Sequence, residues 1–296
     1  MKKIAIKVPG TCGELVQGIC EGNNFQVTCP VELFSYIRLE LDNGDEKKLS
    51  NFPLKIKSQQ ALVSALNYFS FNEKDINLNI EISSKIPYGK GMGSSSADII
   101  GIILGVSILL NKEISADEVA KLALTIEPTD GIMYEDIVCF DHLKKGLLER
   151  IGQPPLLDVL VIDPGGCVDT LEFNRRKDLI RLRLENQKEI VQALELVKRG
   201  IRGKNIKLVG EGATLSALRN QKILFKKELE EVISSSYKMG AVGVNVAHSG
   251  VVLGVLLPPN YSEIENLKNE IKKIYKGNKE LNFYETKLIG GGGRIV

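Results

Sequence analysis

The sequence offers few residues from which to build a zinc site or a disulfide framework. It has two histidines and five cysteines, and no two cysteines form a C-x-x-C pair. The usual spacings of structural zinc sites therefore cannot be assembled. An odd number of cysteines also favours reduced thiols over disulfides. The five cysteines are Cys12, Cys20, Cys29, Cys139 and Cys167.

Long apolar runs and a strong net charge are missing as well. The longest apolar stretch, residues 99–110, is interrupted by two glycines and a serine. It is shorter than the ~18 residues of a membrane span and indicates a buried helix. The first apolar stretch ends at Pro9, too early for a signal peptide. Since 39 basic and 37 acidic residues nearly cancel, nucleic-acid binding is not indicated. We expect a cytoplasmic monomer or homodimer without membrane or nucleic-acid partners.

Strand-like and helix-like segments alternate in both halves of the chain, which predicts an α+β protein with two lobes. A turn is expected at residues 8–13, where a proline and two glycines separate two strands. A boundary is expected near residues 152–155, giving an N-terminal domain of residues 1–152 and a C-terminal domain of residues 153–296. The strands expected are residues 3–8, 14–20, 24–29, 33–41, 76–82, 131–140, 146–151, 156–162, 242–247, 251–257 and 283–289. The helices expected are residues 58–69, 95–110, 115–127, 179–197, 204–218, 224–239 and 262–275.

A glycine-rich loop at residues 87–97 carries the strongest chemical signal. Its members are Pro87, Tyr88, Gly89, Lys90, Gly91, Met92, Gly93, Ser94, Ser95, Ser96 and Ala97. Glycines allow backbone N–H groups to turn inward around a phosphate. The serines open a long apolar helix, whose N-terminus favours an anion. The loop therefore predicts a phosphate-binding site.

The loop fits neither of two common phosphate-binding patterns. The Walker A pattern fails because Ser84 occupies the position of its first glycine, and the Rossmann pattern fails because Ser96 replaces its last. The remaining pattern, P-x-x-x-G-M-G-S-S-S-A, resembles the ATP-binding signature of the GHMP kinases, the superfamily of galactokinase, homoserine kinase, mevalonate kinase and phosphomevalonate kinase. Residues 9–14 resemble the first motif of this superfamily, and residues 240–250 resemble a divergent third motif.

The amino-acid sequences of several segments are similar to those of the L-threonine kinases in particular. These segments are residues 9–18, 29–31, 127–131 and 247–250. The resemblance implies two lobes, an N-terminal domain like domain 2 of ribosomal protein S5 and a ferredoxin-like C-terminal domain. It also implies ATP and Mg²⁺ as cofactors.

The resemblance assigns roles to three residues outside the glycines. Ser95 corresponds to a Mg²⁺-binding serine, although it could simply begin a helix. Glu127 resembles a Mg²⁺-binding glutamate, or is a solvated carboxylate at a helix end. Asp130 is the candidate that orients or deprotonates the acceptor hydroxyl, and it could instead hold a turn beside Gly131.

Acceptor binding is expected from both ends of the chain. Glu14 could pair with an ammonium and Gln17 could hydrogen-bond a carboxylate; an exposed strand edge would explain both equally well. The other acceptor-site candidates are Thr11, His248 and Ser249. Thr11 stands where mevalonate kinase has Lys and galactokinase has Arg, so a cation is missing there. Lys90 could contact phosphate in its place, or be solvated.

The resemblance thus implies an ATP-dependent kinase that converts L-threonine to L-threonine O-3-phosphate for the aminopropanol arm of cobalamin. Two alternatives stay open. One is another small alcohol acceptor, such as homoserine. The other is a catalytically silent sensor that binds ATP or a metabolite.

Overall fold

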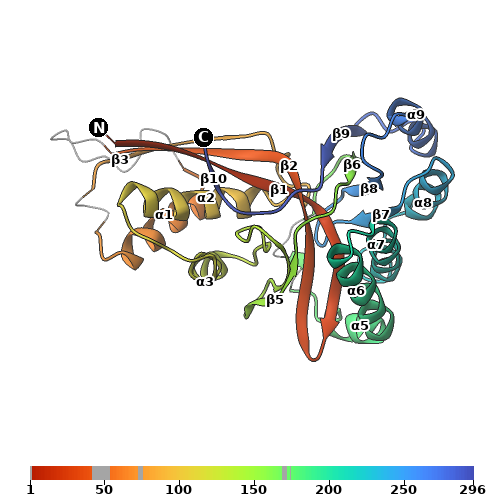
Figure 1. Ribbon diagram of the computed structural model, residues 1–296, viewed down its shortest axis with the longest axis horizontal. Coiled ribbons are helices and arrows are strands. Elements are labelled where there is room, and N and C mark those ends of the chain that lie inside the picture. Colours follow the sequence, from red (N-terminus) through yellow and green to blue (C-terminus); the bar gives the residue numbers. More distant parts are fainter. Residues whose placement is uncertain (1, 42–53, 73–75, 169–171, 174) are drawn as a thin grey trace.

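The computed structural model describes residues 2–41, 54–72, 76–168, 172–173 and 175–296. Its strands form one sheet in the order β5-β4-β2-β1-β7-β8-β6-β9, with β3 paired to β2 and β10 paired to β1. Helices cover this sheet in two groups, one beside each half (Figure 1). No helix within the described ranges is long and apolar enough to span a bilayer.

The long strands β1 (Lys2–Cys20) and β2 (Asn23–Leu41) form a hairpin that runs from the left end of the molecule to its lower middle (Figure 1). The turn expected at residues 8–13 was wrong, because the chain continues as a strand there. Proline and glycine produce irregularities in the strand pairing instead, between Pro9 and Gly10, between Thr11 and Glu14, and between Glu14 and Val16. Such bulges redirect side chains without ending a strand.

Most of the other expected helices and strands are present, but their first and last residues differ from those expected. The remaining strands are β3 (Leu78–Ser84), β4 (Ile137–Asp141), β5 (Gly146–Gly152), β6 (Asp158–Asp163), β7 (Gly243–Val246), β8 (Leu253–Leu257), β9 (Asn282–Lys287) and β10 (Arg294–Ile295). The strand expected at 131–140 was wrong in its first half, which is turns and bends. β10 had no counterpart among the expected strands.

The N-terminal helices are α1 (Ile56–Tyr68), α2 (Ser94–Leu109) and α3 (Ala116–Ile126). α3 begins with a capping box, in which the Ser115 hydroxyl accepts from the Glu118 N–H and the Glu118 carboxylate accepts from the Ser115 N–H. This reciprocal pairing satisfies two N–H groups that a helix start leaves open. α2 is buried along nearly its whole length and lies against β1 and β2.

The C-terminal helices are α5 (Leu179–Glu185), α6 (Gln187–Arg202), α7 (Ile206–Asn220), α8 (Leu229–Lys238) and α9 (Ile264–Ile274). The expected helix 179–197 was wrong as a single element, because it is interrupted at Asn186. The two halves of the sheet join where Glu14 on β1 pairs with Val246 on β7. This junction brings the first and third sequence motifs together.

Candidate active site

A cavity of about 430 Å³ opens where the glycine-rich loop meets the junction of β1 and β7. We call it the central cavity. From the glycine-rich loop it is lined by Tyr88, Gly89, Gly91, Met92, Gly93, Ser94, Ser95 and Ser96. The other lining residues are Glu14, Gln26, Lys57, Glu127, Pro128, Thr129, Asp130, His142, Cys167, Val168, His248 and Ser249. Of the loop residues expected to bind ATP, Pro87, Lys90 and Ala97 lie outside this lining.

The loop's three glycines all adopt the left-handed backbone conformation that other residues rarely occupy. Their φ angles are +73° at Gly89, +79° at Gly91 and +67° at Gly93. A Cβ at Gly91 would lie 2.6 Å from the Cα of Gly250, so the glycine-rich loop and the third motif touch at their glycines. Gly93 is the N-cap of α2, where no side chain caps the helix. The first N–H groups of α2 therefore remain available to an anion at the cavity wall.

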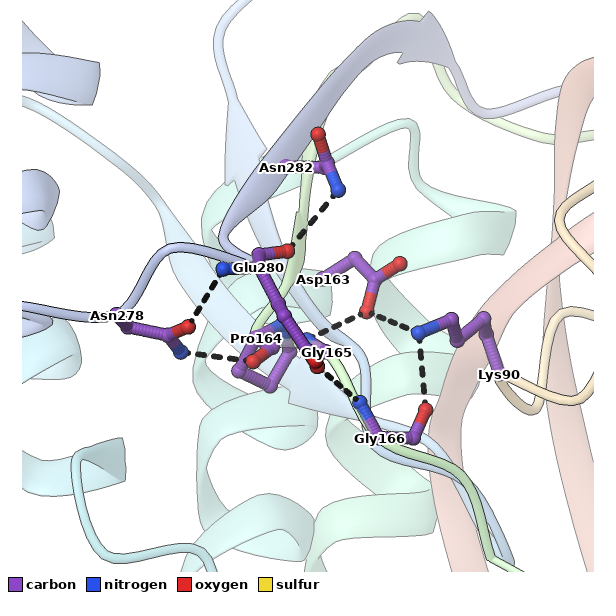
Figure 2. A network of polar contacts seen from close by, with 8 residues as sticks. All are labelled: Lys90, Asp163, Pro164, Gly165, Gly166, Asn278, Glu280 and Asn282. Atoms are coloured by element: carbon purple, nitrogen blue, oxygen red, sulfur yellow. Dashed lines mark hydrogen bonds and ion pairs between the residues drawn. The ribbon is translucent and has the colours of Figure 1, made fainter.

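Lys90 leaves the loop on the side of the C-terminal half (Figure 2). Its ammonium lies 3.3 Å from the buried carboxylate of Asp163 and donates to the carbonyl of Gly166 at 2.9 Å. The Asp163 carboxylate also accepts from the Gly165 N–H, and the Gly166 N–H donates to Glu280. Lys90 thus ties the glycine-rich loop to the segment that follows β6, and Cys167 and Val168 of that segment line the cavity.

Ser95 and Glu127 reach the central cavity from different helices. Ser95 lies in the first turn of α2, and Glu127 is the C-cap of α3 with extended backbone angles. The Glu127 carboxylate is nearly buried and forms an ion pair with Lys57 from the first turn of α1. Hydroxyl and carboxylate oxygens are ligands that suit Mg²⁺, which commonly takes only one or two carboxylates beside substrate phosphates. The donor chemistry therefore fits this metal.

Asp130 lies against the start of α2. The Ser96 hydroxyl donates to its carboxylate at 3.3 Å, and the Asp130 N–H donates back to the same hydroxyl at 3.4 Å. A Cβ at Gly93 would lie 2.9 Å from the carboxylate, so glycine is needed for this approach. Burial, reinforced by the charge of Glu127, raises the pKa of Asp130 to about 6. A carboxyl group with such a pKa can exchange a proton near neutral pH.

Glu14 is buried, and one of its carboxylate oxygens has no hydrogen-bond partner among the described residues. Burial, and then the neighbouring charge of Asp130, raises the pKa of Glu14 well above its usual value. Two carboxyl groups in one buried space favour a cation between them. Thr11 is also buried, and its N–H donates to the Met92 carbonyl at 2.9 Å, so it holds the loop from behind the cavity wall.

His248 and Gln17 contact each other. Arg183 can only donate, so the His248 Nε2 that lies 3.2 Å from its Nη2 is an acceptor. Nδ1 then carries the proton and donates to the Gln17 side-chain oxygen at 2.6 Å. Burial, together with the charge of Arg183, lowers the pKa of His248 well below its usual value. His248 and Ser249 line the cavity, whereas Gln17 lies behind His248.

Outside the glycine-rich loop, seven lining residues were not among the site residues predicted from the sequence, namely Gln26, Lys57, Pro128, Thr129, His142, Cys167 and Val168. Thr129 lies inside the segment 127–131 that resembles the L-threonine kinases, and the predicted site residues Glu127 and Asp130 lie in the same segment. Lys57 lies in the first turn of α1, which begins two residues before the start that was expected at residue 58. Gln26 and His142 carry no local pattern and reach the cavity only through strand pairing. Cys12 is a buried thiol outside the cavity lining, and burial raises its pKa.

Comparisons with known proteins identify the family to which the chain belongs. Residues 59–138 match the family described as GHMP kinases N terminal domain. The chain is 31% identical over 264 residues to the L-threonine kinase of Citrobacter freundii, covering 88% of both proteins. It is 29% identical over 287 residues to the L-threonine kinase of Salmonella typhimurium, covering 97% of this chain and 94% of that protein.

The fold is similar to solved structures as well. The crystal structure of homoserine kinase from Cytophaga hutchinsonii superposes with a TM-score of 0.77 over 100% of this chain and 98% of that one. Sequence identity in that superposition is 15%, so the similarity concerns the fold. It confirms the α+β class and the two-lobed arrangement expected from the sequence.

Proposed function

This chain belongs to the GHMP kinases and is a phosphotransferase that acts on a hydroxyl group; from that premise, we propose that it transfers the γ-phosphate of ATP to the side-chain hydroxyl of L-threonine. The product would be L-threonine O-3-phosphate, and its proposed use is the aminopropanol arm of cobalamin. The observation that carries the proposal is one cavity lined by the glycine-rich loop, by Asp130 and by Glu14.

In this proposal the phosphates lie on the glycine-rich loop. The N–H groups of the loop and of the first turn of α2 donate to phosphate oxygens, and the positive end of α2 favours their charge. Ser95 and Glu127 would hold Mg²⁺. When bound, the metal would neutralise part of the negative charge on the phosphates.

Asp130 would hold the acceptor hydroxyl in line with the γ-phosphate and take its proton as the new O–P bond forms. A raised pKa suits this role, because a base whose pKa lies near the working pH both stays ionised and accepts a proton readily. Glu14 would pair with the α-ammonium of the amino acid. An ammonium beside both carboxyl groups would also favour the ionised form of Asp130.

The experiment is an ADP-release assay with Mg²⁺ and four acceptors: L-threonine, L-serine, L-homoserine and mevalonate. L-Threonine should give the highest kcat/KM. L-Serine should follow, since one missing methyl group in an apolar pocket costs only ~1–3 kcal/mol of discrimination. L-Homoserine should be poor, because its hydroxyl lies one carbon further from the ammonium.

Two outcomes would contradict the proposal in different ways. A higher kcat/KM for L-homoserine or mevalonate would replace the acceptor while leaving the kinase assignment intact. ATP binding without ADP release from any acceptor would favour the silent sensor.

A further inference from the structure

Four residues of the central cavity have buried polar atoms without a hydrogen-bond partner among the described residues. These atoms are Glu14 Oε2, Gln26 Oε1, Thr129 Oγ1 and both ring nitrogens of His142. All four residues are at least 95% buried. A buried polar atom without a partner costs about 1–3 kcal/mol, so several in one cavity indicate a ligand that satisfies them.

The four residues come from neighbouring parts of the sheet. Glu14 lies on β1 and Gln26 on β2, and Gln26 pairs with Phe140 of β4. His142 directly follows β4, and its carbonyl accepts from the Thr129 N–H at 3.2 Å. Because β4, β2 and β1 are neighbours in the sheet, these residues share one side of the cavity. Glu14 and Gln26 offer acceptor oxygens there, and Thr129 and His142 can donate hydrogen bonds.

The electrostatics on the His142 side favour an anion. Arg183 is buried, and its guanidinium donates to the neutral groups Asn24 and His248. Within the described ranges no carboxylate lies within ion-pair distance of it. Burial, together with the charge of Arg183, lowers the pKa of His142 to about 3, so its ring is neutral and presents one N–H. A buried cation that no described carboxylate pairs with, behind a neutral donor, favours a negative ligand group.

We propose that these four residues recognise both ends of a zwitterionic amino-acid acceptor. Glu14 and Gln26 accept hydrogen bonds from its α-ammonium. His142 and Thr129 donate to its α-carboxylate, and the charge of Arg183 stabilises that carboxylate from behind. This inference rests on the proposed function and deepens it, because it assigns the carboxylate to residues other than Gln17, whose side-chain oxygen already accepts from His248.

The test pairs side-chain changes with acceptors that lack one end. 1-Amino-2-propanol keeps the hydroxyl and the ammonium of L-threonine but lacks the carboxylate. 3-Hydroxybutyrate keeps the hydroxyl and the carboxylate but lacks the ammonium. The variants are His142→Ala and Thr129→Val for one end and Gln26→Met for the other. Thr286→Val is the matched control, because Thr286 also has a buried hydroxyl without a partner but lies on β9, outside the cavity lining.

With L-threonine, each cavity variant should lower kcat/KM by roughly 10- to 100-fold, the effect of one lost hydrogen bond to a charged group. With 1-amino-2-propanol, His142→Ala and Thr129→Val should have almost no effect. With 3-hydroxybutyrate, Gln26→Met should have almost no effect. The KM for ATP should stay unchanged in every variant. Thr286→Val should match the unmodified protein with all acceptors.

Stability provides a second readout. Thr129→Val and Gln26→Met replace a buried atom without a partner by an apolar group of similar size, so neither should lower the thermal midpoint. If His142→Ala and Thr129→Val reduce turnover of L-threonine and 1-amino-2-propanol equally, the inference is wrong while the proposed function stands. If the unmodified protein phosphorylates other alcohols and neither L-threonine nor its analogues, the proposed function fails and the inference with it.

Discussion

At the scale of single residues, the central cavity combines charges that folding alone does not favour. Asp130 is held within reach of the loop by Ser96, and the negative charges of Glu14 and Glu127 lie near its carboxyl group. A like charge nearby raises the free energy of the ionised form. Such an arrangement is typical of residues selected for chemistry rather than for stability.

Changing Asp130 to Asn should separate the role of this residue in the chemistry from its effect on stability. Turnover with L-threonine should fall by ~10²–10⁴, the usual contribution of a positioned general base, while the KM for ATP changes little. In the unmodified protein, kcat/KM should decrease as pH falls through about 6, the pKa of Asp130, because the base becomes protonated. Steady-state kinetics between pH 5 and 8 test both points. Normal turnover of Asp130→Asn with every acceptor would remove this residue from the chemistry.

The same substitution should stabilise the fold at neutral pH. A raised folded-state pKa means that Asp130 contributes stability below its unfolded pKa of 3.8, and that this contribution is lost as pH rises through about 6. At pH 7.5, Asp130→Asn should therefore raise the free energy of unfolding by about 1–3 kcal/mol, since one pKa unit corresponds to ~1.4 kcal/mol. Near pH 4 the difference should vanish. Urea unfolding at both pH values measures it, and equal stabilities at pH 7.5 would contradict the raised pKa.

Ser95→Ala should affect the metal requirement and leave the fold intact. The N-cap of α2 is Gly93, and no side chain caps this helix, so the Ser95 hydroxyl carries no cap that the variant would lose. If Ser95 holds Mg²⁺, the variant should need a higher Mg²⁺ concentration for half-maximal rate and have a lower kcat, with an unchanged thermal midpoint. Titrating Mg²⁺ at fixed ATP gives the comparison, for which Ser94→Ala is the neighbouring control. An unchanged Mg²⁺ dependence would exclude Ser95 as a ligand.

At the scale of elements, the glycine-rich loop is held from two sides. The backbone of Thr11 binds it through the Met92 carbonyl, and the Val251 N–H donates to the Lys90 carbonyl at 3.1 Å. The Lys90 side chain then connects it to Asp163 at the end of β6 (Figure 2). Loop positions that bind phosphate must be held before the ligand arrives, because ordering them on binding would weaken affinity.

Lys90 and Asp163 should therefore act as a pair. Lys90→Met and Asp163→Asn should each raise the KM for ATP. The KM of the double variant should be no higher than that of the more impaired single variant, because both substitutions remove the same contact. Lys90→Met should also lower the thermal midpoint more, since it leaves the buried Asp163 carboxylate without its cation. A double-mutant cycle on the KM for ATP is the measurement. If Lys90 instead binds phosphate directly, Lys90→Met alone should be far more damaging than Asp163→Asn.

At the scale of the whole molecule, two neutral histidines connect the two halves of the sheet, the buried His142 and the half-buried His248. His142 follows β4, His248 follows β7, and their rings lie edge to face with centroids 4.7 Å apart. The pKa of each lies below its usual value, chiefly through burial. Protonating either ring would place a charge in the interior near Arg183.

His142 should therefore make the fold sensitive to acid. Its folded pKa is lowered, so its contribution to stability is present above the unfolded pKa of 6.5 and is lost as pH falls toward about 3. The free energy of unfolding of the natural chain, minus that of His142→Phe, should fall by up to ~1.4 kcal/mol per pH unit below pH 6.5. The opposing carboxyls Glu14 and Asp130 are present in both proteins and cancel in this difference. Urea unfolding at pH 7, 6 and 5 tests it, and a constant difference would show that His142 is not buried in its neutral form.

The sequence by itself determined the class of the fold, the glycine-rich loop and its helix, and the family. These are local properties, because a helix N-terminus after three glycines needs only neighbouring residues to define it. The roles of Ser95, Glu127 and Asp130 as ligands and base stay predictions, although all three line the cavity that the loop begins.

Only the tertiary structure decided which polar side chains share the cavity. Strict alternation along residues 14–17 would set Glu14 and Gln17 on opposite faces, but the bulge after Glu14 shifts the register, so that Glu14 lines the cavity and Gln17 supports His248. Lys57 meets Glu127, and His142 meets His248, across separations of 70 and more than 100 positions in the chain. No periodicity within either segment specifies such a contact, because strand pairing and helix packing set it over the whole chain.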